Sequence, residues 1–346
     1  MSQVSLARSG RSFAPLMLAA AGVLGAFAAP ALSQITPDRT YYGIGRSIPM
    51  KIEVPKDAEG EVTLQLIAPA TNEVVQSAGA AAGEVNLAEK FPTLWTTSDP
   101  RLLYVQLAVG DKKIGAPVVL QALVAPPYAT RVDGAGNPTW QRGPKTYSGL
   151  RAYVDKHILL DTSKGEVEIA LRPDMAPNTV WNFRGLVEGG YYTEVIFHRI
   201  ADLNGDSTID ILQVGDPGAG NPATAGSGGP GYCIDLEAST MPHDLGVISM
   251  ARTPDPNSNG SQIFICLNKS GTSFLDGKYT TFGETVRGAD ILKLLGAVQT
   301  TPQTQRPVDP PMIKSARLVD APPIGAPQPD AKKAEGATAQ PVEKPR

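Results

Sequence analysis

The chain of 346 residues has few cysteines and histidines, the side chains that most zinc sites use. It contains two cysteines and three histidines (His157, His198 and His243), and no spacing between them suits zinc. Charged residues make up 19% of the chain and the net charge is −3. A chain without excess basic charge lacks the electrostatic footprint of nucleic-acid binding. We therefore expect no zinc site and no nucleic-acid partner.

Long apolar runs are also scarce, and the one present lies near the N-terminus. Arg8 and Arg11 precede an Ala-rich apolar stretch at 13–29, and small residues follow at the positions that a signal peptidase needs. We expect residues 1–33 to be a signal peptide cleaved before Gln34. The mature protein would then be exported, periplasmic or secreted, without a membrane span. The alternative is an uncleaved anchor, although the run is at the short end for a membrane span.

Residues 34–125 contain short apolar segments at regular spacing. The segments 47–54, 61–68 and 102–109 alternate apolar and polar residues, and a further apolar strand is expected at 117–124. No segment is typical of a helix. The spacing predicts a small antiparallel β-sandwich of immunoglobulin-like type. It holds no catalytic constellation, so we interpret it as a spacer or docking module. A scaffold or adhesion role for it is a further alternative.

Two segments have compositions that do not favour a packed core. Residues 126–149 are rich in Pro, Gly and Thr without periodicity, and we interpret them as a linker. Residues 321–346 repeat Pro, Ala and Lys and cannot bury enough apolar surface to offset the entropy of ordering, so we expect a disordered, solubilising tail.

Residues 150–320 combine many strands with two helices. The segments 157–161 and 166–171 flank a hairpin turn, and Pro177 is suited to the first turn of a helix. A second helix is expected at 290–295. This pattern fits a closed barrel with a helix at each end.

Unusual polar residues lie inside two apolar strands of this region, Arg199 in the first and Gln262 in the second. Four motif blocks follow one another along the chain: 195–200, 213–217, 259–265 and 274–278. Their order resembles the cyclophilin family of peptidyl-prolyl cis/trans isomerases over about residues 150–320. The resemblance implies a mainly β protein with a closed, eight-stranded antiparallel barrel and two helices, preceded here by the β-sandwich.

The resemblance also implies an activity and a set of site residues. Arg199 matches the catalytic arginine of the family. The substrate-binding residues implied are Ile211, Gln213, Ala251, Arg252, Gln262, Phe264, Phe274, Leu275 and Tyr279. Phe274 stands where many members carry tryptophan, and Tyr279 where many carry histidine. The expected substrates are proline-containing proteins and peptides, with no cofactor, and we expect a monomer. All these residues follow the linker, so a fragment starting near Gly149 should keep the activity.

The chemistry of the reaction explains why these residue types are suitable. Rotation about a peptide bond is opposed by resonance, with a barrier of roughly 18–20 kcal/mol, and X-Pro isomers exchange slowly. A catalyst needs a donor aimed at the prolyl nitrogen, an apolar pocket for the pyrrolidine ring and polar groups that hold the rotating carbonyl. The guanidinium of Arg199 stays charged and offers several fixed donors.

The chain departs from the family between Arg199 and Gln213, where the intervening segment is longer than usual. Ile211 can replace a methionine of the pocket wall, but Asp210 stands where a pocket phenylalanine is expected. This change leaves an alternative function open, that of a catalytically weakened, cyclophilin-like peptide-binding or chaperone module.

The inserted segment also has oxygen-bearing residues at alternate positions: Asp202, Asn204, Asp206, Thr208 and Asp210. That spacing occurs in calcium loops of the EF-hand type. Ser207 replaces the usual glycine, however, and Gln213 falls where a bidentate glutamate is required. We therefore prefer a polar loop of Asx turns without a metal, and keep calcium as the alternative.

The two cysteines, Cys233 and Cys266, both lie in apolar contexts. Export would permit a disulfide between them. We prefer the interpretation that both are buried free thiols.

Overall fold

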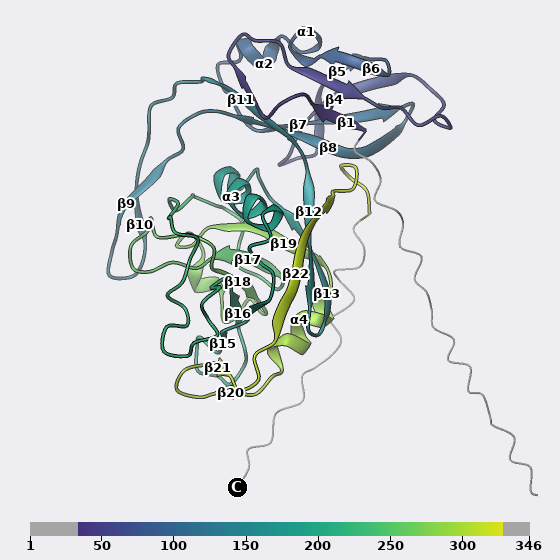
Figure 1. Cartoon of the computed structure of the whole chain (residues 1–346). Coiled ribbons are helices and arrows are strands. Elements are labelled where there is room, and N and C mark those ends of the chain that lie inside the picture. The colour runs from purple at the N-terminus through teal and green to yellow at the C-terminus, as the bar shows by residue number, and fades with distance from the viewer. Residues whose placement is uncertain (1–33, 328–346) are drawn as a thin grey trace, which may run out of the picture. The chain divides into compact units, whose positions relative to one another are not determined.

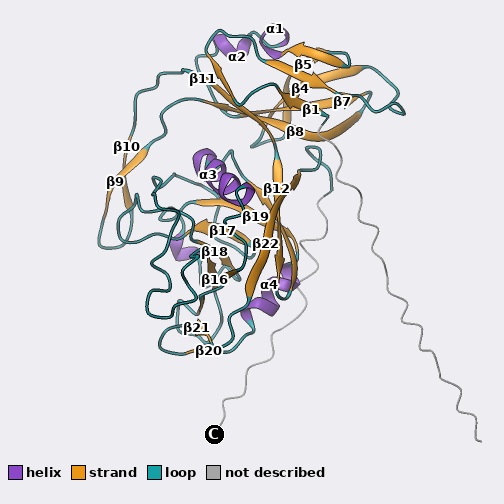
Figure 2. Cartoon of the chain, viewed as in Figure 1, coloured by secondary structure: helices purple, strands orange, loops and turns teal. Residues whose placement is uncertain are grey.

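The computed structural model describes residues 34–327 (Figure 1). The predicted signal peptide and residues 328–346 of the predicted tail lie outside the described residues. Strands dominate the described part of the chain and the helices are short (Figure 2). Within residues 34–327, no helix has the length and apolar character needed to cross a membrane.

The first unit consists of two antiparallel sheets. The larger sheet has six strands in the order β2 (Tyr41–Gly43), β11 (Gly149–Val154), β8 (Lys112–Ala122), β7 (Leu103–Val109), β4 (Val62–Ala68) and β5 (Glu73–Gly79). The smaller sheet has three, in the order β1 (Ile35–Pro37), β3 (Pro49–Ile52) and β6 (Gly83–Asn86). Leu64, Leu107 and Ile52 are buried in one core that takes side chains from both sheets, which agrees with the predicted sandwich.

Two short helices complete this core. α1 (Leu87–Lys90) and α2 (Thr93–Thr96) contribute the buried side chains of Leu87 and Leu94. Asn86 caps α1, because its side-chain oxygen accepts the N–H of Ala88 at 3.2 Å. The expectation of no helix in this unit is therefore wrong, because four residues are too few to show a helical period.

The linker segment has more structure than its composition indicated. β9 (Tyr128–Val132) and β10 (Pro138–Gln141) form a hairpin, and the carboxylate of Asp133 in its turn accepts the N–H groups of Ala135 and Asn137. Asn257 of the barrel region donates its side-chain N–H to the carbonyl of Ala129 at 2.9 Å. β11 pairs with β8 and β2, so the segment after residue 148 belongs to the first sheet rather than to the barrel.

The barrel starts one residue after β11. Its sheet order is β14 (Val195–Ile196), β22 (Met312–Asp320), β12 (Lys156–Thr162), β13 (Gly165–Leu171), β19 (Thr281–Arg287), β17 (Val247–Met250), β18 (Ile263–Cys266), β16 (Ile211–Val214) and β15 (Arg199–Ala201). β14 and β15 are at opposite ends of this order, yet only Phe197 and His198 separate them in the chain. Together they act as one interrupted strand that closes the sheet, which confirms the predicted eight-stranded barrel.

Two helices lie toward opposite ends of the barrel (Figure 1), as predicted. α3 (Pro177–Glu188) begins with proline and buries Val180, Phe183 and Val187; α4 (Ala289–Gly296) buries Leu292 and Leu295. Ala176 offers no cap to α3. The carboxylate of Glu237 accepts the N–H groups of Asn178 and Thr179 instead. Short pieces complete the unit: η1 (Ser273–Leu275), β20 (Thr300–Thr301) and β21 (Arg306–Pro307).

The cysteines differ from each other in burial. Both are free thiols; Cys266 in β18 is buried and Cys233 is exposed. The expectation of two buried thiols is therefore wrong for Cys233. That residue lies in an irregular segment next to an isolated bridge between Ile234 and Asn259, not inside a strand.

Candidate active site

The predicted catalytic residues come together because three strands are neighbours in the barrel. β15 pairs with β16, and β16 pairs with β18, so Arg199 lies opposite Gln213 and Gln213 lies opposite Phe264. Residues opposite each other on adjacent strands project to the same face of the sheet. One row across the sheet therefore carries the arginine, a glutamine and an aromatic ring.

Hydrogen bonds join Arg199 and Gln213 of this row to Gln262, which directly precedes β18. Arg199 Nη1 donates to Gln213 Oε1 at 3.3 Å, and Gln213 Nε2 donates to Gln262 Oε1 at 3.0 Å. Gln262 Nε2 in turn donates to the carbonyl oxygens of Gly226 and Gly228, each at 2.8 Å. The two glutamines thus link the guanidinium to the backbone of a glycine-rich loop, which fixes their orientation.

Gln305 is a further partner of Arg199 that the motifs did not reveal. Its Oε1 accepts the Nε–H of Arg199 at 3.0 Å, its Nε2 donates to the carbonyl of Asp202 at 2.9 Å, and its own carbonyl accepts the N–H of Ile200 at 2.9 Å. Gln305 has a φ of 54°, in the left-handed region. It follows the site motifs in the sequence and lies in a turn, so neither spacing nor periodicity could have identified it.

The guanidinium of Arg199 remains a charged donor in this setting. Burial lowers its pKa from the ordinary value, but the ordinary value is so high that the group stays protonated. Its Nε and Nη1 are engaged by Gln305 and Gln213. Within residues 34–327 its other N–H groups have no partner, so they remain able to donate to a ligand.

A buried apolar cluster adjoins these polar side chains, and it is the candidate pocket for a prolyl ring. Ile211, Phe264 and Leu275 are buried in one cluster with Ala201 and Cys266. Ala251 and Tyr279 pack against this cluster, and the Tyr279 ring meets Phe264 edge to face, with centroids 5.8 Å apart. The structure therefore gathers five of the predicted substrate-binding residues around one apolar surface: Ile211, Ala251, Phe264, Leu275 and Tyr279.

Asp210, which stands where the family has a pocket phenylalanine, bonds to the inserted segment and to Asn268. Asp210 is fully buried, and its Oδ2 accepts the N–H of Leu203 at 2.7 Å while its Oδ1 accepts Nδ2–H of Asn268 at 2.7 Å. These bonds hold the inserted segment against the barrel. Leu203 of that segment packs on the pocket cluster and supplies apolar surface there.

The inserted segment is a series of Asx turns. The carboxylate of Asp202 accepts the N–H groups of Asn204, Gly205 and Ser207, and that of Asp206 accepts the N–H of Thr208. The backbone of the loop therefore already uses these carboxylate oxygens. In the described ranges, no group of three or more His, Cys, Asp and Glu side chains is placed to hold a metal ion.

His243 packs against Phe264, and no sequence motif identified it. Its ring stacks on Phe264 at 5.7 Å with 9° between the planes. Nδ1 lies 2.8 Å from Asp276 Oδ1 and Nε2 lies 3.0 Å from Ser249 Oγ. Burial lowers the pKa of this histidine, and the bond to Asp276 partly offsets that effect. The imidazole is thus a neutral support for the aromatic wall.

Arg252 and Phe274 do not belong to the apolar cluster, and Ala251 also bonds to the backbone of Gln262. Arg252 donates from Nε and Nη2 to the carbonyl of Lys278 and lies 4.6 Å from the centroid of the Tyr279 ring, so it orients that ring. The N–H of Ala251 donates to the carbonyl of Gln262 at 2.9 Å. Phe274 is 52% exposed and does not join the pocket cluster.

A cavity of about 440 Å³ extends the site beyond the glutamines. Gln213, Ala251, Arg252 and Gln262 form part of its lining, and the glycine-rich loop and the exposed Cys233 form another part. An extended peptide that placed a proline in the apolar pocket would have room here for neighbouring residues.

Comparisons with known proteins identify the family of the barrel region. The family model of cyclophilin type peptidyl-prolyl cis-trans isomerase/CLD matches residues 157–318. Peptidyl-prolyl cis-trans isomerase-like 1 of Aspergillus oryzae is 36% identical over 163 residues, which are 47% of this chain and 95% of that relative. Peptidyl-prolyl cis-trans isomerase ppi1 of Schizosaccharomyces pombe is 37% identical over 169 residues, 47% of this chain and 99% of that relative.

Among solved structures, a cyclophilin type peptidyl-prolyl cis-trans isomerase of Cryptosporidium parvum is 29% identical. The match covers 48% of this chain and 99% of that chain, with a TM-score of 0.42.

A closed barrel of eight strands, with an arginine–glutamine row beside an apolar pocket, defines a class of prolyl isomerases. The chain belongs to the family of cyclophilin-type peptidyl-prolyl cis-trans isomerases, and residues 157–318 carry the family domain. The residues before β12 lie outside that match.

Proposed function

We propose that this enzyme isomerises X-Pro bonds in exported proteins while they fold. The isomerase activity follows from family membership. The observation that supports export is the N-terminal segment, with Arg8 and Arg11 before an Ala-rich apolar stretch and small residues ahead of Gln34. Clients of an exported folding enzyme are themselves exported chains.

The site geometry supports a specific assignment of roles. The pyrrolidine ring would enter the pocket of Ile211, Phe264 and Leu275, which is apolar and buried. The free N–H groups of Arg199 would donate to the prolyl nitrogen and withdraw its lone pair from resonance with the carbonyl. The backbone at Ala251 and the side chain of Gln262 would hold the substrate chain. The single observation that carries this assignment is the position of the Arg199–Gln213–Gln262 row beside that pocket.

The row is preorganised before any substrate arrives. Gln305 and Gln213 fix the guanidinium on two sides, so little reorganisation is required when the prolyl nitrogen becomes pyramidal. The argument for a weakened binding module rested on Asp210 in the pocket. The bond of Asp210 to the inserted segment, and the packing of Leu203 on the apolar cluster, support the enzyme over the binder.

Export is tested separately from catalysis. Residues 1–40 fused to alkaline phosphatase, which is active only after export, should give activity outside the cytoplasm. Replacing both Arg8 and Arg11 with glutamate should reduce it. N-terminal sequencing of the mature enzyme should start at Gln34. A reporter that stays inactive, or an enzyme isolated with residues 1–33 attached, would contradict the proposal for export but leave the isomerase assignment unaffected.

A further inference from the structure

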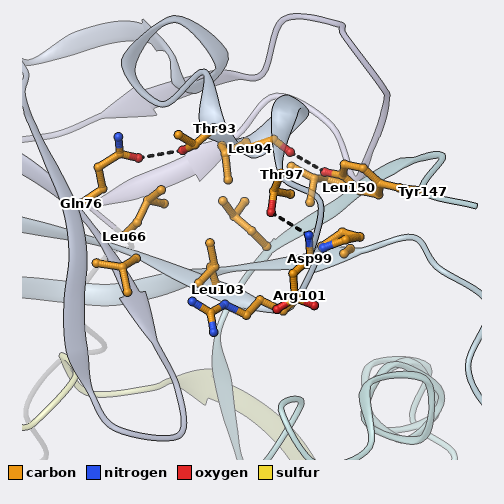
Figure 3. Close-up of a pocket in the computed structure, with 14 residues that line it drawn as sticks. Leu66, Gln76, Thr93, Leu94, Thr97, Asp99, Arg101, Leu103, Tyr147 and Leu150 are labelled. Carbon is orange, nitrogen blue, oxygen red and sulfur yellow. Dashed lines mark hydrogen bonds between the residues drawn. The ribbon is translucent and has the colours of Figure 1, made fainter. Parts of the chain in front are cut away.

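The β-sandwich contains a cavity of about 290 Å³ that the isomerase reaction does not use (Figure 3). Its apolar lining includes Leu66, Leu94, Leu103, Leu120 and Leu150, which belong to β4, α2, β7, β8 and β11. The six-stranded sheet is wider than the three-stranded sheet that faces it. The short helix α2 and the segment that follows it line the cavity opposite β4 and β7, and an opening remains.

Hydrogen bonds between polar groups at the opening of the cavity maintain its shape. Thr93 Oγ1 donates to Gln76 Oε1 at 2.8 Å, and the Tyr147 hydroxyl donates to the carbonyl of Leu94 at 2.8 Å (Figure 3). The first bond joins α2 to β5, and the second joins α2 to the segment before β11. The cavity is therefore built into the fold and does not depend on a loose loop.

The outer strand of the large sheet, β5, borders this cavity. β5 pairs only with β4, so its other side is a free sheet edge. The N–H of Ala80, just after β5, donates to the carbonyl of Val62 at 2.9 Å. In an antiparallel pair the residues alternate in direction, so the N–H and C=O groups of Gly79 and Ser77 point away from β4. Within residues 34–327 these groups have no hydrogen-bond partner.

The edge strand also exposes apolar side chains. Val74 and Val75 are each 45% exposed. A register shift lies between Leu66 and Ile67, and two successive residues of β5, Val75 and Gln76, both line the cavity. An apolar, unpaired edge is a template for another extended chain. Here a cavity beside the edge provides space for one of that chain's side chains.

Arg101 adds a charge at the mouth. Its side chain extends alongside Leu103 (Figure 3) and has no ion-pair partner in the described residues. Asp99 also lines the cavity and carries the opposite charge. A single acidic residue placed near Arg101 would therefore be favoured, whereas a strongly acidic peptide would not.

We propose that β5 and this cavity form a second polypeptide-binding site, separate from the catalytic groove. An extended segment of another protein would add as a strand to β5, with an apolar side chain in the cavity and an acidic residue near Arg101. Added strands obtain affinity from main-chain hydrogen bonds and specificity from pockets for alternate side chains. A free edge of backbone donors and acceptors matches a polypeptide and not a compact small molecule.

The test uses the full-length protein and a proline-free peptide, which separates this site from the catalytic one. The probe is a fluorescein-labelled heptapeptide that alternates threonine with leucine and carries one glutamate, and fluorescence anisotropy reports its binding. Ser77→Pro removes an outward N–H that β4 does not use, whereas Ser77→Ala keeps it. Ala122→Phe places a ring in the cavity from β8, where Ala122 forms part of the lining.

We expect Ser77→Pro and Ala122→Phe each to weaken binding about tenfold or more, which is the scale of one main-chain hydrogen bond. Ser77→Ala should bind as the wild type does. Arg199→Ala should also bind normally, because the probe contains no proline. Arg101→Gln should remove the preference for glutamate over lysine in the probe. Isomerase rates on short X-Pro peptides should be unchanged in the Ser77, Ala122 and Arg101 variants.

Three results would overturn the proposal. The wild type could fail to bind the probe, or Ser77→Pro and Ala122→Phe could both bind it as tightly as the wild type. Binding could also be lost in Arg199→Ala, which would place the peptide in the catalytic groove. The other possible occupant of the β5 edge is a second copy of this chain, which sedimentation tests. A wild-type dimer that Ser77→Pro dissociates would assign the edge to this second copy.

Discussion

Gln305 Oε1 lies 3.0 Å from Nε of Arg199 and accepts its hydrogen, although the two residues belong to distant parts of the chain. Gln213 binds the same guanidinium at Nη1. An arginine side chain in a pocket has several rotatable bonds, and two fixed acceptors limit it to one direction. The structure therefore shows the candidate catalytic arginine held in place by two glutamines.

The first prediction concerns Gln305 as a positioning residue. Gln305→Ala removes one acceptor from the guanidinium, a hydrogen bond to a charged group worth about 1.5–3 kcal/mol. We expect kcat/KM in a protease-coupled assay to fall by about tenfold or more, mainly through kcat. Gln303→Ala, at an exposed position in the same turn, is the matched control. Equal rates for the two variants would show that Gln305 has no positioning role.

The second prediction concerns the inserted segment. Asp210→Ala leaves the N–H of Leu203 and the amide of Asn268 without their acceptor, so the free energy of unfolding in urea should fall by about 2–4 kcal/mol. Asp206→Ala, at an exposed carboxylate of the same loop, should cost much less. Millimolar calcium should not change the melting temperature, because the loop backbone already occupies these oxygens. A rise with calcium that Asp206→Ala abolishes would restore the metal hypothesis.

The third prediction is a pH effect through His243. Burial lowers the pKa of this histidine in the folded protein. The unfolded chain binds a proton as the pH falls through about 6.5, while the folded imidazole stays neutral to lower pH. Its contribution to stability is therefore complete above about pH 6.5 and is lost as the pH falls toward the folded pKa.

Burial raises the pKa of carboxyl groups such as Glu237, so these groups change the stability in the opposite direction as the pH falls. The contribution of His243 is therefore isolated by comparing the wild type with a variant that lacks this histidine. We expect the gap in unfolding free energy between the wild type and His243→Gln to shrink as the pH falls from 7.5 to 5. A gap that stays constant would mean that His243 is protonated equally in the folded and unfolded states.

The fourth prediction concerns the first unit. All residues assigned to catalysis follow β11, so a fragment of residues 155–327 should keep kcat/KM on short peptides. Its melting temperature should fall, because Trp181 of α3 loses its contacts with the rings of Tyr41 and Tyr153. A fragment that is folded by circular dichroism yet inactive would show that the first unit contributes to the site.

Much of the fold could be predicted from the sequence because its signals are local. The alternating segments predicted several strands of the first unit, and Pro177 predicted the start of α3. The short helices α1 and α2 and the hairpin in the linker were not predictable, because they are too short for a period or depend on a distant partner such as Asn257.

The site was predictable where residues lie inside motifs and not elsewhere. Arg199 and Gln213 are polar residues in apolar strands, and that contrast marks them; Gln262, expected inside a strand, directly precedes β18. Gln305 and His243 lie outside the motifs in the sequence and are brought next to the site only by the fold. The hydrogen bonds of Asp210 to Leu203 and Asn268 could not be predicted, because the motif does not show how the longer segment folds.

The most direct test of the central claim is the rate of X-Pro isomerisation by the Arg199→Ala protein. Loss of a preorganised donor typically costs on the order of 10²–10³ in rate, so kcat/KM in the protease-coupled assay should fall by that factor. The circular dichroism spectrum should match that of the wild type. Arg199→Lys should recover little, because a single ammonium group cannot bond to Gln305 and Gln213 and still donate in a fixed direction. A correctly folded Arg199→Ala protein that isomerises at the wild-type rate would contradict the assignment of catalysis to this site.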